Sequence, residues 1–394
     1  MPFNFDSVID RSTTNSIKWR KYPQDVLPLW VADMDFAAPA PIQEALKLAV
    51  QHGVLGYESP TRELCETVAA RMYKLYGWQV SPEAVVATPG VVAGFAIAAH
   101  TLCVAGDGIL VQPPVYPPFL KIHEAGGWMC QETPLVMETD GSILRYAVDF
   151  GIFQKAVHSA GAKTGMFLLC NPHNPTGQAY SRDDLSRMAE ICLKNDVIIC
   201  SDEIHSELLL GGTKHIPIAA LNPEIADRTI TLVAPSKTFN VPGLFCGFAI
   251  IPNHDLLERY KKTVECMAMH VNSLGLVAAQ AAFSGVCDEW LAALCTYLTG
   301  NRDFLVKFIK SEFIGIRTTV PDATYLAWLD CNELVKSGKV SVTPYEFFLK
   351  QAKVAFNDGK EFGSGGEGFV RLNFGCPRTT LVEALGRMKS ALDL

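Results

Sequence analysis

Short apolar runs alternate with helix-like segments over residues 84–251, and this alternation restricts the fold more than any other feature of the sequence. Strands that alternate with helices are typical of α/β proteins built on a mostly parallel sheet. We therefore predict an α/β fold whose buried strands in this region are 84–88, 109–112, 166–170, 197–200, 230–234 and 247–251.

The chain has 394 residues, which is more than one simple core usually organises, so we expect more than one domain. Apolar residues make up 49% and charged residues 19%, as in a packed globular protein. The pattern turns helical after residue 252 and then mixes strands with helices. We predict an N-terminal arm over 1–45 that packs in part with the small domain, a large cofactor-binding domain over 46–285, and a small α+β domain over 286–394.

Charge and cysteine usage restrict the partners and the compartment. The net charge is −7 without a long run of like charge, which argues against a nucleic-acid partner. The start MPFNFDSVIDR lacks the features of a signal peptide, and the longest apolar stretch is too short to span a bilayer. The twelve cysteines lie mostly in or beside apolar runs and form no C-x2-C pair. We expect a cytoplasmic protein with no membrane partner, no disulfide framework and no metal site.

Polar residues follow two of the predicted strands at the point where each strand ends. Asp202 and His205 follow the strand 197–200, and Lys237 follows the strand 230–234. In open α/β sheets, ligands bind outside the carboxyl ends of the strands, so we expect these side chains to share one crevice. A lysine and an acid suit pyridoxal phosphate (PLP), because the amine binds the aldehyde and the acid keeps the ring nitrogen protonated. Each residue alone also fits an ordinary surface charge or helix cap.

The segment Thr88-Pro-Gly-Val-Val92 places a glycine turn between a strand and a helix. Unpaired amides at a helix N-terminus, together with the helix dipole, form an anion site. We therefore predict a phosphate cradle at Gly90, Val91 and Val92, to which Ser236 adds a hydroxyl. Such turns are common in α/β proteins, so the motif gains weight only beside Lys237.

Further candidates are spread along the chain. Tyr116 lies between prolines and can stack on a flat ring, although it equally fits a packed loop residue. Asn174 can donate its amide to the phenolic oxygen of PLP. Arg371 can form a bidentate pair with a substrate carboxylate, although an arginine on a strand is more often a surface residue.

The motifs carry a resemblance to a known family. The chain contains NPHNPTG, SDEIH, SKTFNVPGL and RLNFG, in this order, and resembles the fold-type I PLP enzymes of the aminotransferase class I/II group. The segments WVADMDF, LGYESP, TPGVV and DEIH are most similar to its cystathionine β-lyase or C-S lyase branch. The resemblance implies the PLP-dependent transferase fold, with a mostly parallel seven-stranded sheet in the large domain.

The resemblance also implies roles for individual residues. Lys237 is the catalytic lysine that binds the PLP aldehyde, and Asp202 is the partner of the ring nitrogen. His205 and Asn174 lie near the phenolic oxygen, and Tyr116 stacks on the ring.

Phosphate and substrate contacts follow in the same way. The backbone at residues 90–92 contacts the phosphate, and Arg371 holds the substrate α-carboxylate. Tyr57 reaches the phosphate of the neighbouring subunit, which implies a homodimer with shared active sites.

Two departures from the aminotransferase pattern affect the expected reaction. Many aminotransferases have an arginine where this chain has Phe245, and a serine where it has Ala234. The missing arginine is typical of the β-lyase branch. We therefore expect α,β-elimination from cystathionine or another S-substituted cysteine, giving a thiol, pyruvate and ammonia. An aminotransferase with the same cofactor site is the first alternative, and a non-catalytic regulatory or binding protein is the second.

Overall fold

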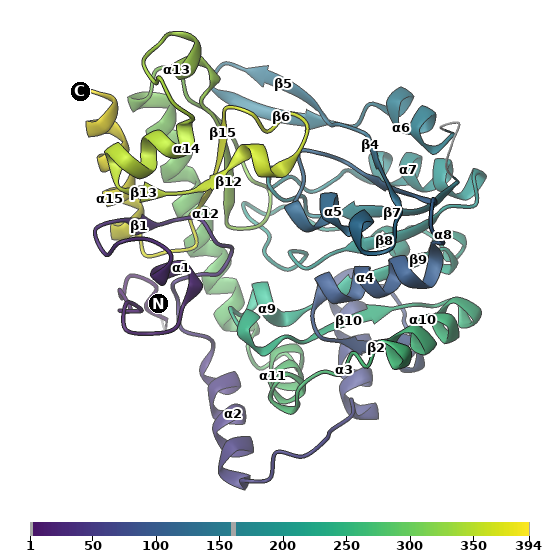
Figure 1. The fold of residues 1–394 in the computed structure, drawn as a ribbon. Helices are drawn as coiled ribbons and strands as arrows, with labels where there is room; N and C mark the ends of the chain where they lie inside the picture. The colour runs from purple at the N-terminus through teal and green to yellow at the C-terminus, as the bar shows by residue number, and fades with distance from the viewer. Residues whose placement is uncertain (1–2, 159–162, 394) are drawn as a thin grey trace.

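The computed structural model describes residues 3–158 and 163–393. Its centre is a seven-stranded sheet that lies among helices (Figure 1). In spatial order the strands are β2 (Val85–Thr88), β10 (Gly247–Ile250), β9 (Thr229–Val233), β8 (Ile198–Asp202), β7 (Thr164–Cys170), β3 (Gly108–Val111) and β4 (Met129–Glu132). Neighbours from β9 to β4 are parallel, and only β10 runs antiparallel to its two neighbours. The predicted α/β fold with a mostly parallel sheet is confirmed.

Helices cover both faces of this sheet, and the strand sequences explain why. Along β7, Phe167 and Leu169 pack in one apolar cluster, whereas Met166 and Leu168 pack in another. Alternate residues of a strand point to opposite faces, so a strand that is apolar throughout needs cover on both sides. One face carries α4 (Val91–Leu102), α5 (Pro117–Lys121) and α10 (His254–Cys266), and the other carries α6 (Phe150–Val157) and α7 (Arg182–Lys194).

A second sheet is built mainly from strands of the C-terminal part of the chain. Its order is β14 (Asn357–Asp358), β15 (Phe369–Asn373), β12 (Leu326–Asp330), β11 (Arg317–Thr319), β6 (Ile143–Ala147) and β5 (Val136–Asp140). Thus β6, which belongs to the range 46–285, pairs with β11 of the range 286–394, and β5 extends the sheet by pairing with β6. The N-terminal arm joins the same part, because β1 (Leu27–Pro28) pairs with β13 (Val354–Ala355). The domain boundaries themselves stay a prediction.

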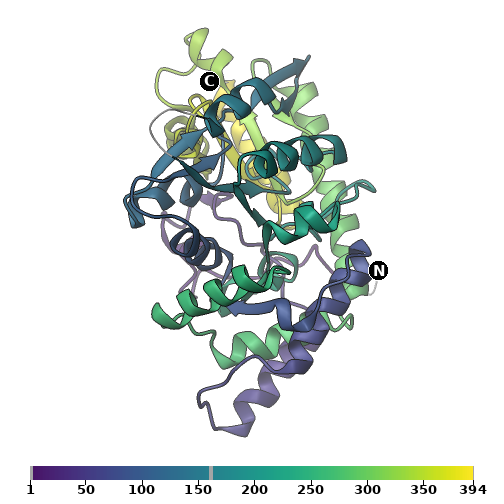
Figure 2. The same ribbon diagram turned by 90° about the vertical axis from the view of Figure 1, so that its right-hand side faces the viewer.

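Further helices pack around the two sheets, and Figure 2 shows the same ribbon turned by 90°. They are α3 (Arg62–Tyr76), α11 (Ser273–Phe283), α12 (Asp288–Glu312) and α15 (Arg378–Leu392). A further helix, α2 (Ala40–His52), packs along α11 and extends from the body of the molecule (Figure 1). It ends where Gly53 adopts a left-handed conformation with a φ of 78°, as a glycine C-cap does.

Short elements complete the fold. They are α1 (Ile17–Arg20), α8 (Pro223–Asp227), α9 (Pro235–Thr238), α13 (Asn332–Lys336), α14 (Pro344–Phe347) and the turns η1 (Pro82–Ala84), η2 (Ile122–Ala125), η3 (Ile218–Ala220), η4 (Pro242–Leu244), η5 (Phe348–Ala352) and η6 (Gly359–Phe362). None of the helices in the described residues combines the length and the apolar character needed to cross a bilayer.

Candidate active site

A cavity of about 960 Å³ opens at the carboxyl ends of the central strands, where the two sheets meet. It brings together ten of the eleven predicted site residues, which are Gly90, Val91, Val92, Tyr116, Asn174, Asp202, His205, Ser236, Lys237 and Arg371. They follow β2, β3, β7, β8 and β9 in the large sheet, and the arginine comes from β15 in the second sheet. The residues that the sequence places at separate strand ends therefore form one site.

Lys237 lies in the short helix α9, directly after the end of β9. Its Nζ donates a hydrogen bond to the carbonyl oxygen of Ala32 at 2.5 Å. Burial lowers the pKa of this amine to about 8, and the nearby carboxylate of Asp33 opposes the shift. A lysine with such a pKa supplies neutral amine near physiological pH, which both nucleophilic attack and proton abstraction require.

Asp202 is the last residue of β8 and is buried. Its carboxylate accepts a hydrogen bond from the backbone amide of Ile204 at 3.0 Å. Burial raises the pKa of this carboxyl to about 7, while that hydrogen bond and the charge of Lys237 oppose the rise. A cationic ring nitrogen beside Asp202 would favour the carboxylate form, so this environment suits a protonated pyridine.

Arg371 is buried, and its hydrogen-bond partners among the described residues are neutral. It donates to Asn174 Oδ1 at 2.9 Å, to Asn357 Oδ1 at 2.6 Å and to the carbonyl oxygen of Trp30 at 3.0 Å. Its Nε has no partner in the described part of the chain, and burial lowers the pKa of the guanidinium to about 10. A buried cation with neutral partners favours an anionic ligand, so the site suits a substrate carboxylate.

The rings of His205 and Tyr116 line the same cavity as Arg371. Burial lowers the pKa of His205, so its imidazole is neutral, and its Nδ1 has no partner among the described residues. Tyr116 directly precedes α5 as its N-cap, and its backbone amide donates to the carbonyl oxygen of Asn174 at 3.1 Å. Asn174 lines the cavity, and because its Oδ1 accepts from Arg371, its Nδ2 remains as a donor. These groups match a planar cofactor that has a polar edge.

The N-terminus of α4 lines another part of the same cavity. Gly90 has a φ of 98°, a conformation that residues with a side chain rarely adopt, and its amide donates to the carbonyl oxygen of Thr88 at 2.7 Å. The following amides of Val91 and Val92 belong to a helix N-terminus, which attracts phosphate. Phe245 lines the same cavity with a φ of 44° and an exposed fraction of 64%.

One wall of the cavity is formed by a segment that was not predicted to belong to the site. The segment 29–36, which contains WVADMDF, crosses the site and offers backbone carbonyls to its cations. The carbonyl oxygen of Ala32 accepts from Lys237 and also from the hydroxyl of Tyr325 at 2.8 Å. Asn373 holds the same segment through its Nδ2, which donates to Val31 and Asp33 carbonyls, each at 2.7 Å. The sequence feature that could have indicated this wall is the pair Asp33 and Asp35 within an otherwise apolar segment.

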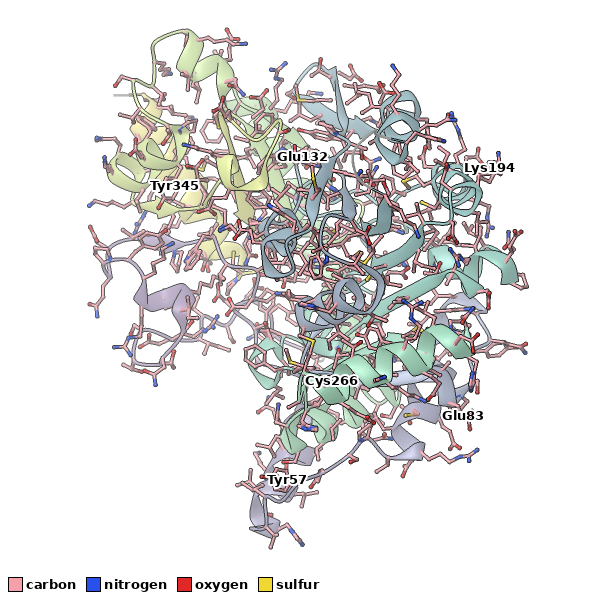
Figure 3. All side chains as sticks on the ribbon, turned by 45° about the vertical axis from the view of Figure 1, so that its right-hand side comes forward. Tyr57, Glu83, Glu132, Lys194, Cys266 and Tyr345 are labelled. Atoms are coloured by element: carbon pink, nitrogen blue, oxygen red, sulfur yellow. The ribbon has the colours of Figure 1, made fainter. Side chains whose placement is uncertain are left out.

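Tyr57 is the one predicted residue that lies outside the cavity. It is fully exposed in the loop between α2 and α3, at the end of the molecule that α2 forms (Figure 3). Its proposed contact with phosphate would therefore have to be made on another subunit.

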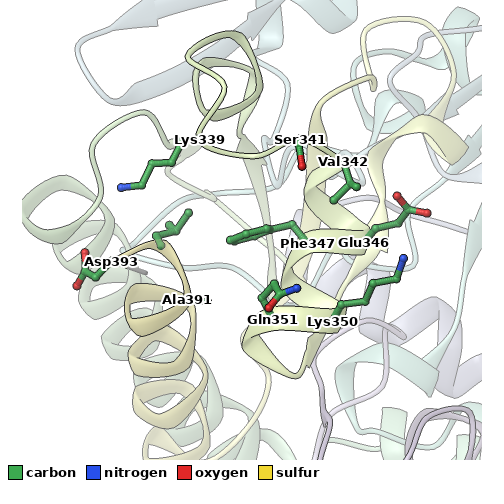
Figure 4. Close-up of a pocket in the computed structure, with 10 residues that line it drawn as sticks. Lys339, Ser341, Val342, Glu346, Phe347, Lys350, Gln351, Ala391 and Asp393 are labelled. Atoms are coloured by element: carbon green, nitrogen blue, oxygen red, sulfur yellow. The ribbon is translucent and has the colours of Figure 1, made fainter.

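A separate hollow lies between α14, η5 and the end of α15 (Figure 4). Lys339, Glu346, Lys350 and Asp393 lie around it, and it contains none of the predicted site residues. Among the described residues, no group of three or more His, Cys, Asp or Glu side chains is placed to hold a metal ion.

Comparison with known proteins identifies the class to which this fold and site correspond. The chain belongs to the aminotransferase class I and II family, whose model matches residues 24–388. It is 39% identical to cystathionine beta-lyase PatB of Bacillus subtilis (strain 168), over 99% of this chain and 100% of PatB. The predicted family and the PLP-dependent transferase fold are thus confirmed.

Solved structures agree with this relationship. The structure is similar to cystalysin from Treponema denticola, which contains a PLP cofactor, with a TM-score of 0.91 and 32% identity over 100% of this chain and 99% of cystalysin. It is also similar to the PLP-bound C-S lyase from Staphylococcus hominis, with a TM-score of 0.91 and 32% identity over 99% of this chain and 98% of the lyase.

Proposed function

We propose that this protein is a PLP-dependent C-S β-lyase that converts cystathionine or another S-substituted cysteine to a thiol, pyruvate and ammonia. The observation that carries the proposal is one buried group, in which Lys237 and Asp202 share a cavity with Arg371, a cation whose partners are neutral. The names of PatB and of the Staphylococcus hominis enzyme support the lyase reaction.

The residues that would hold PLP fit its chemical groups. The amides at 90–92 and the Ser236 hydroxyl suit the phosphate, and Asp202 suits the ring nitrogen. The Nδ1 of His205, which has no partner in residues 3–158 and 163–393, and the amide of Asn174 suit the polar edge of the ring. When bound, PLP supplies an electron sink that stabilises negative charge on the substrate Cα.

The protein then positions the substrate and moves the protons. Arg371 holds the α-carboxylate, which places Cα beside Lys237. The Lys237 amine removes the Cα proton as a general base. Asp202 would favour the protonated ring nitrogen of bound PLP, and the bond between Cβ and sulfur breaks as the thiolate leaves. Burial of these groups excludes water from the reacting atoms.

The aminotransferase alternative uses the same residues, and family membership favours it as the second candidate. In that reaction Lys237 would again move the Cα proton, PLP would supply the site that carries the amino group, and no bond to sulfur would break. Phe245, in place of the arginine found in many aminotransferases, favours the lyase. The complete set of site residues argues against a non-catalytic binding protein.

We also propose a homodimer in which Tyr57 completes the partner's phosphate site. The exposure of Tyr57, together with Leu55 and Val54 beside it, supports this assembly. The twelve cysteines all lie in the described part of the chain as free thiols, which supports the proposed cytoplasmic location.

An absorbance scan followed by a pyruvate assay tests the proposal. We expect a band from bound PLP that changes in Lys237→Ala, and pyruvate from cystathionine without an added 2-oxo acid. Turnover that requires a 2-oxo acid would indicate an aminotransferase instead. No band after addition of PLP would contradict the cofactor assignment.

A further inference from the structure

The cavity has a second polar end that the proposed cofactor contacts do not use. Its side chains come from the N-terminal arm and from the segment 29–36, and they are Arg11, Asn15, Ser16, Lys18 and Asp33. The cavity therefore offers more charged and polar side chains than PLP and a small S-alkyl cysteine would contact.

Arg11 and Asp33 form a partly open ion pair at this end. Arg11 NH2 lies 2.8 Å from Asp33 Oδ2, and the two side chains keep exposed fractions of 22% and 19%. The other oxygen, Asp33 Oδ1, has only long contacts within the described residues: 3.5 Å to Arg11 NH1 and 3.6 Å to Lys18 Nζ. Asp33 therefore retains an acceptor for a ligand cation.

A neighbouring pair fixes the arm in place. Lys18 Nζ lies 2.7 Å from Asp35 Oδ2, and both side chains are buried. Asp35 Oδ1 also accepts from Trp19 Nε1 at 3.1 Å and from Arg11 NH1 at 2.8 Å. Arg11 also donates to Ser16 Oγ at 3.0 Å and to the Met34 carbonyl at 3.3 Å, so these contacts and the Lys18–Asp35 pair hold the arm while Arg11 and Asp33 line the cavity.

The segment 29–36 links this pair to the reacting centre. The Trp30 carbonyl accepts from Arg371, the Ala32 carbonyl accepts from Lys237, and Asp33 comes next in the chain. Asp33 lines the same cavity as Lys237 and Arg371, and its charge acts on the Lys237 amine, so it faces the same space as the reacting centre.

We propose that Arg11 and Asp33 are the specificity-determining pair for thioether substrates whose distal end is a second α-amino acid group, as in cystathionine. Asp33 accepts from the distal ammonium, and Arg11 binds the distal carboxylate. A zwitterion adds no net charge to this pair, so both ligand charges are matched without leaving a protein charge unpaired. This inference rests on the proposed lyase function and names its substrate class.

Binding measurements without turnover test the pair. In a PLP-loaded Lys237→Ala background, calorimetry gives dissociation constants for cystathionine and for S-ethylcysteine. We expect Arg11→Gln and Asp33→Asn each to lower the affinity for cystathionine relative to S-ethylcysteine by about tenfold. Arg62→Gln is the matched control, because Arg62 lies on the surface and pairs with Glu66.

Ligand variation gives a second test that requires no change in the cavity. In the Lys237→Ala protein, S-(3-carboxypropyl)cysteine lacks the distal amine, and S-(3-aminopropyl)cysteine lacks the distal carboxylate. We expect both to bind about tenfold more weakly than cystathionine. Equal affinities for these ligands, or unchanged ratios in Arg11→Gln and Asp33→Asn, would overturn the proposal.

The two proposals fail in different ways. Absence of pyruvate with the unmodified protein would remove the lyase function, while the affinity ratios would still decide whether the pair binds a distal amino acid group. Pyruvate formation, together with unchanged affinity ratios in Arg11→Gln and Asp33→Asn, would refute the role of the pair and leave the lyase function intact.

Discussion

At the scale of single residues, the site is built from buried groups that need a partner of opposite charge. Burial shifts Asp202, Lys237 and Arg371 toward their neutral forms, and the hydrogen-bond partners of Arg371 in the described residues are neutral. A cationic ring nitrogen and an anionic substrate would each restore a charged pair. The same electrostatics that disfavour an isolated charge in this site therefore favour a cofactor and a zwitterionic substrate.

Replacement of Asp202 by asparagine tests the ring-nitrogen contact. A neutral amide of nearly the same size keeps the packing but cannot stabilise the protonated ring, so we expect Asp202→Asn to lower kcat by roughly 100-fold or more. Steady-state kinetics with saturating PLP, with the absorbance of bound PLP as the control, measure this effect. A kcat within a few-fold of the unmodified protein would contradict the assigned contact.

The pKa of Lys237 predicts how cofactor capture depends on pH. Only the neutral amine adds to an aldehyde, and a pKa of about 8 means that its fraction increases as pH rises through 8. We expect the rate at which PLP recombines with the apoprotein to rise from about pH 7 to about pH 9 and then to level off. Stopped-flow absorbance measures this rate. A continued rise toward 10.5, the ordinary value for lysine, would show that burial does not lower this pKa.

At the scale of elements, the segment 29–36 acts as a wall that depends on distant anchors. Asn373 donates to two carbonyls of this segment and also accepts from the Gly375 amide at 2.8 Å. We expect Asn373→Ala to lower the free energy of unfolding by about 2 kcal/mol and to raise the KM for the amino-acid substrate. Denaturant titration and steady-state kinetics provide the two measurements.

Asn195→Ala is the control for this change. Asn195 donates a side-chain hydrogen bond to the carbonyl oxygen of Ile191 at 2.7 Å, near the end of α7 and away from the cavity. Removal of this side chain should lower the free energy of unfolding by less than Asn373→Ala does, and it should leave the KM unchanged. An unchanged KM in Asn373→Ala would show that the segment does not need this anchor.

The elements also show how far the sequence was informative. The buried strands β7, β8 and β9 were predicted because each is apolar over most of its length and ends in polar residues. By contrast, β5 is exposed along its length and pairs with β6, which in turn pairs with the distant β11, so local pattern alone did not predict it. The helical segment 344–352 consists of α14 followed by the π-helical turn η5.

The sequence likewise predicted some residues of the candidate site and not others. Residues at strand ends, such as Asp202 and Lys237, were predicted because parallel strands bring their carboxyl ends to one edge. Asp33 and Arg11 were not assigned to the cavity, because their positions depend on how the arm folds back over the sheet. Asn357, which binds Arg371, comes from a strand of only two residues that carries no recognisable pattern.

At the scale of the whole molecule, the exposed loop with Tyr57 predicts subunit complementation. Lys237→Ala and Tyr57→Ala each remove one part of the proposed shared site. If the parts come from different subunits, a mixed dimer contains one intact site. We expect co-expression in equal amounts to restore about a quarter of the unmodified activity, because about half of the dimers are mixed and each has one working site.

Differently tagged subunits allow the mixed dimer to be purified and assayed. Each variant alone is the control and should have little activity. Activity of the mixed dimer no greater than the average of the two variants would contradict a shared site.

The central claim is that this site breaks a carbon–sulfur bond, and the product balance tests it most directly. The purified holoenzyme is mixed with S-ethylcysteine in the absence of any 2-oxo acid, and ethanethiol, pyruvate and ammonia are each quantified. The lyase account predicts equal amounts of all three over many turnovers. Failure to release thiol, with turnover appearing only when a 2-oxo acid is supplied, would contradict it.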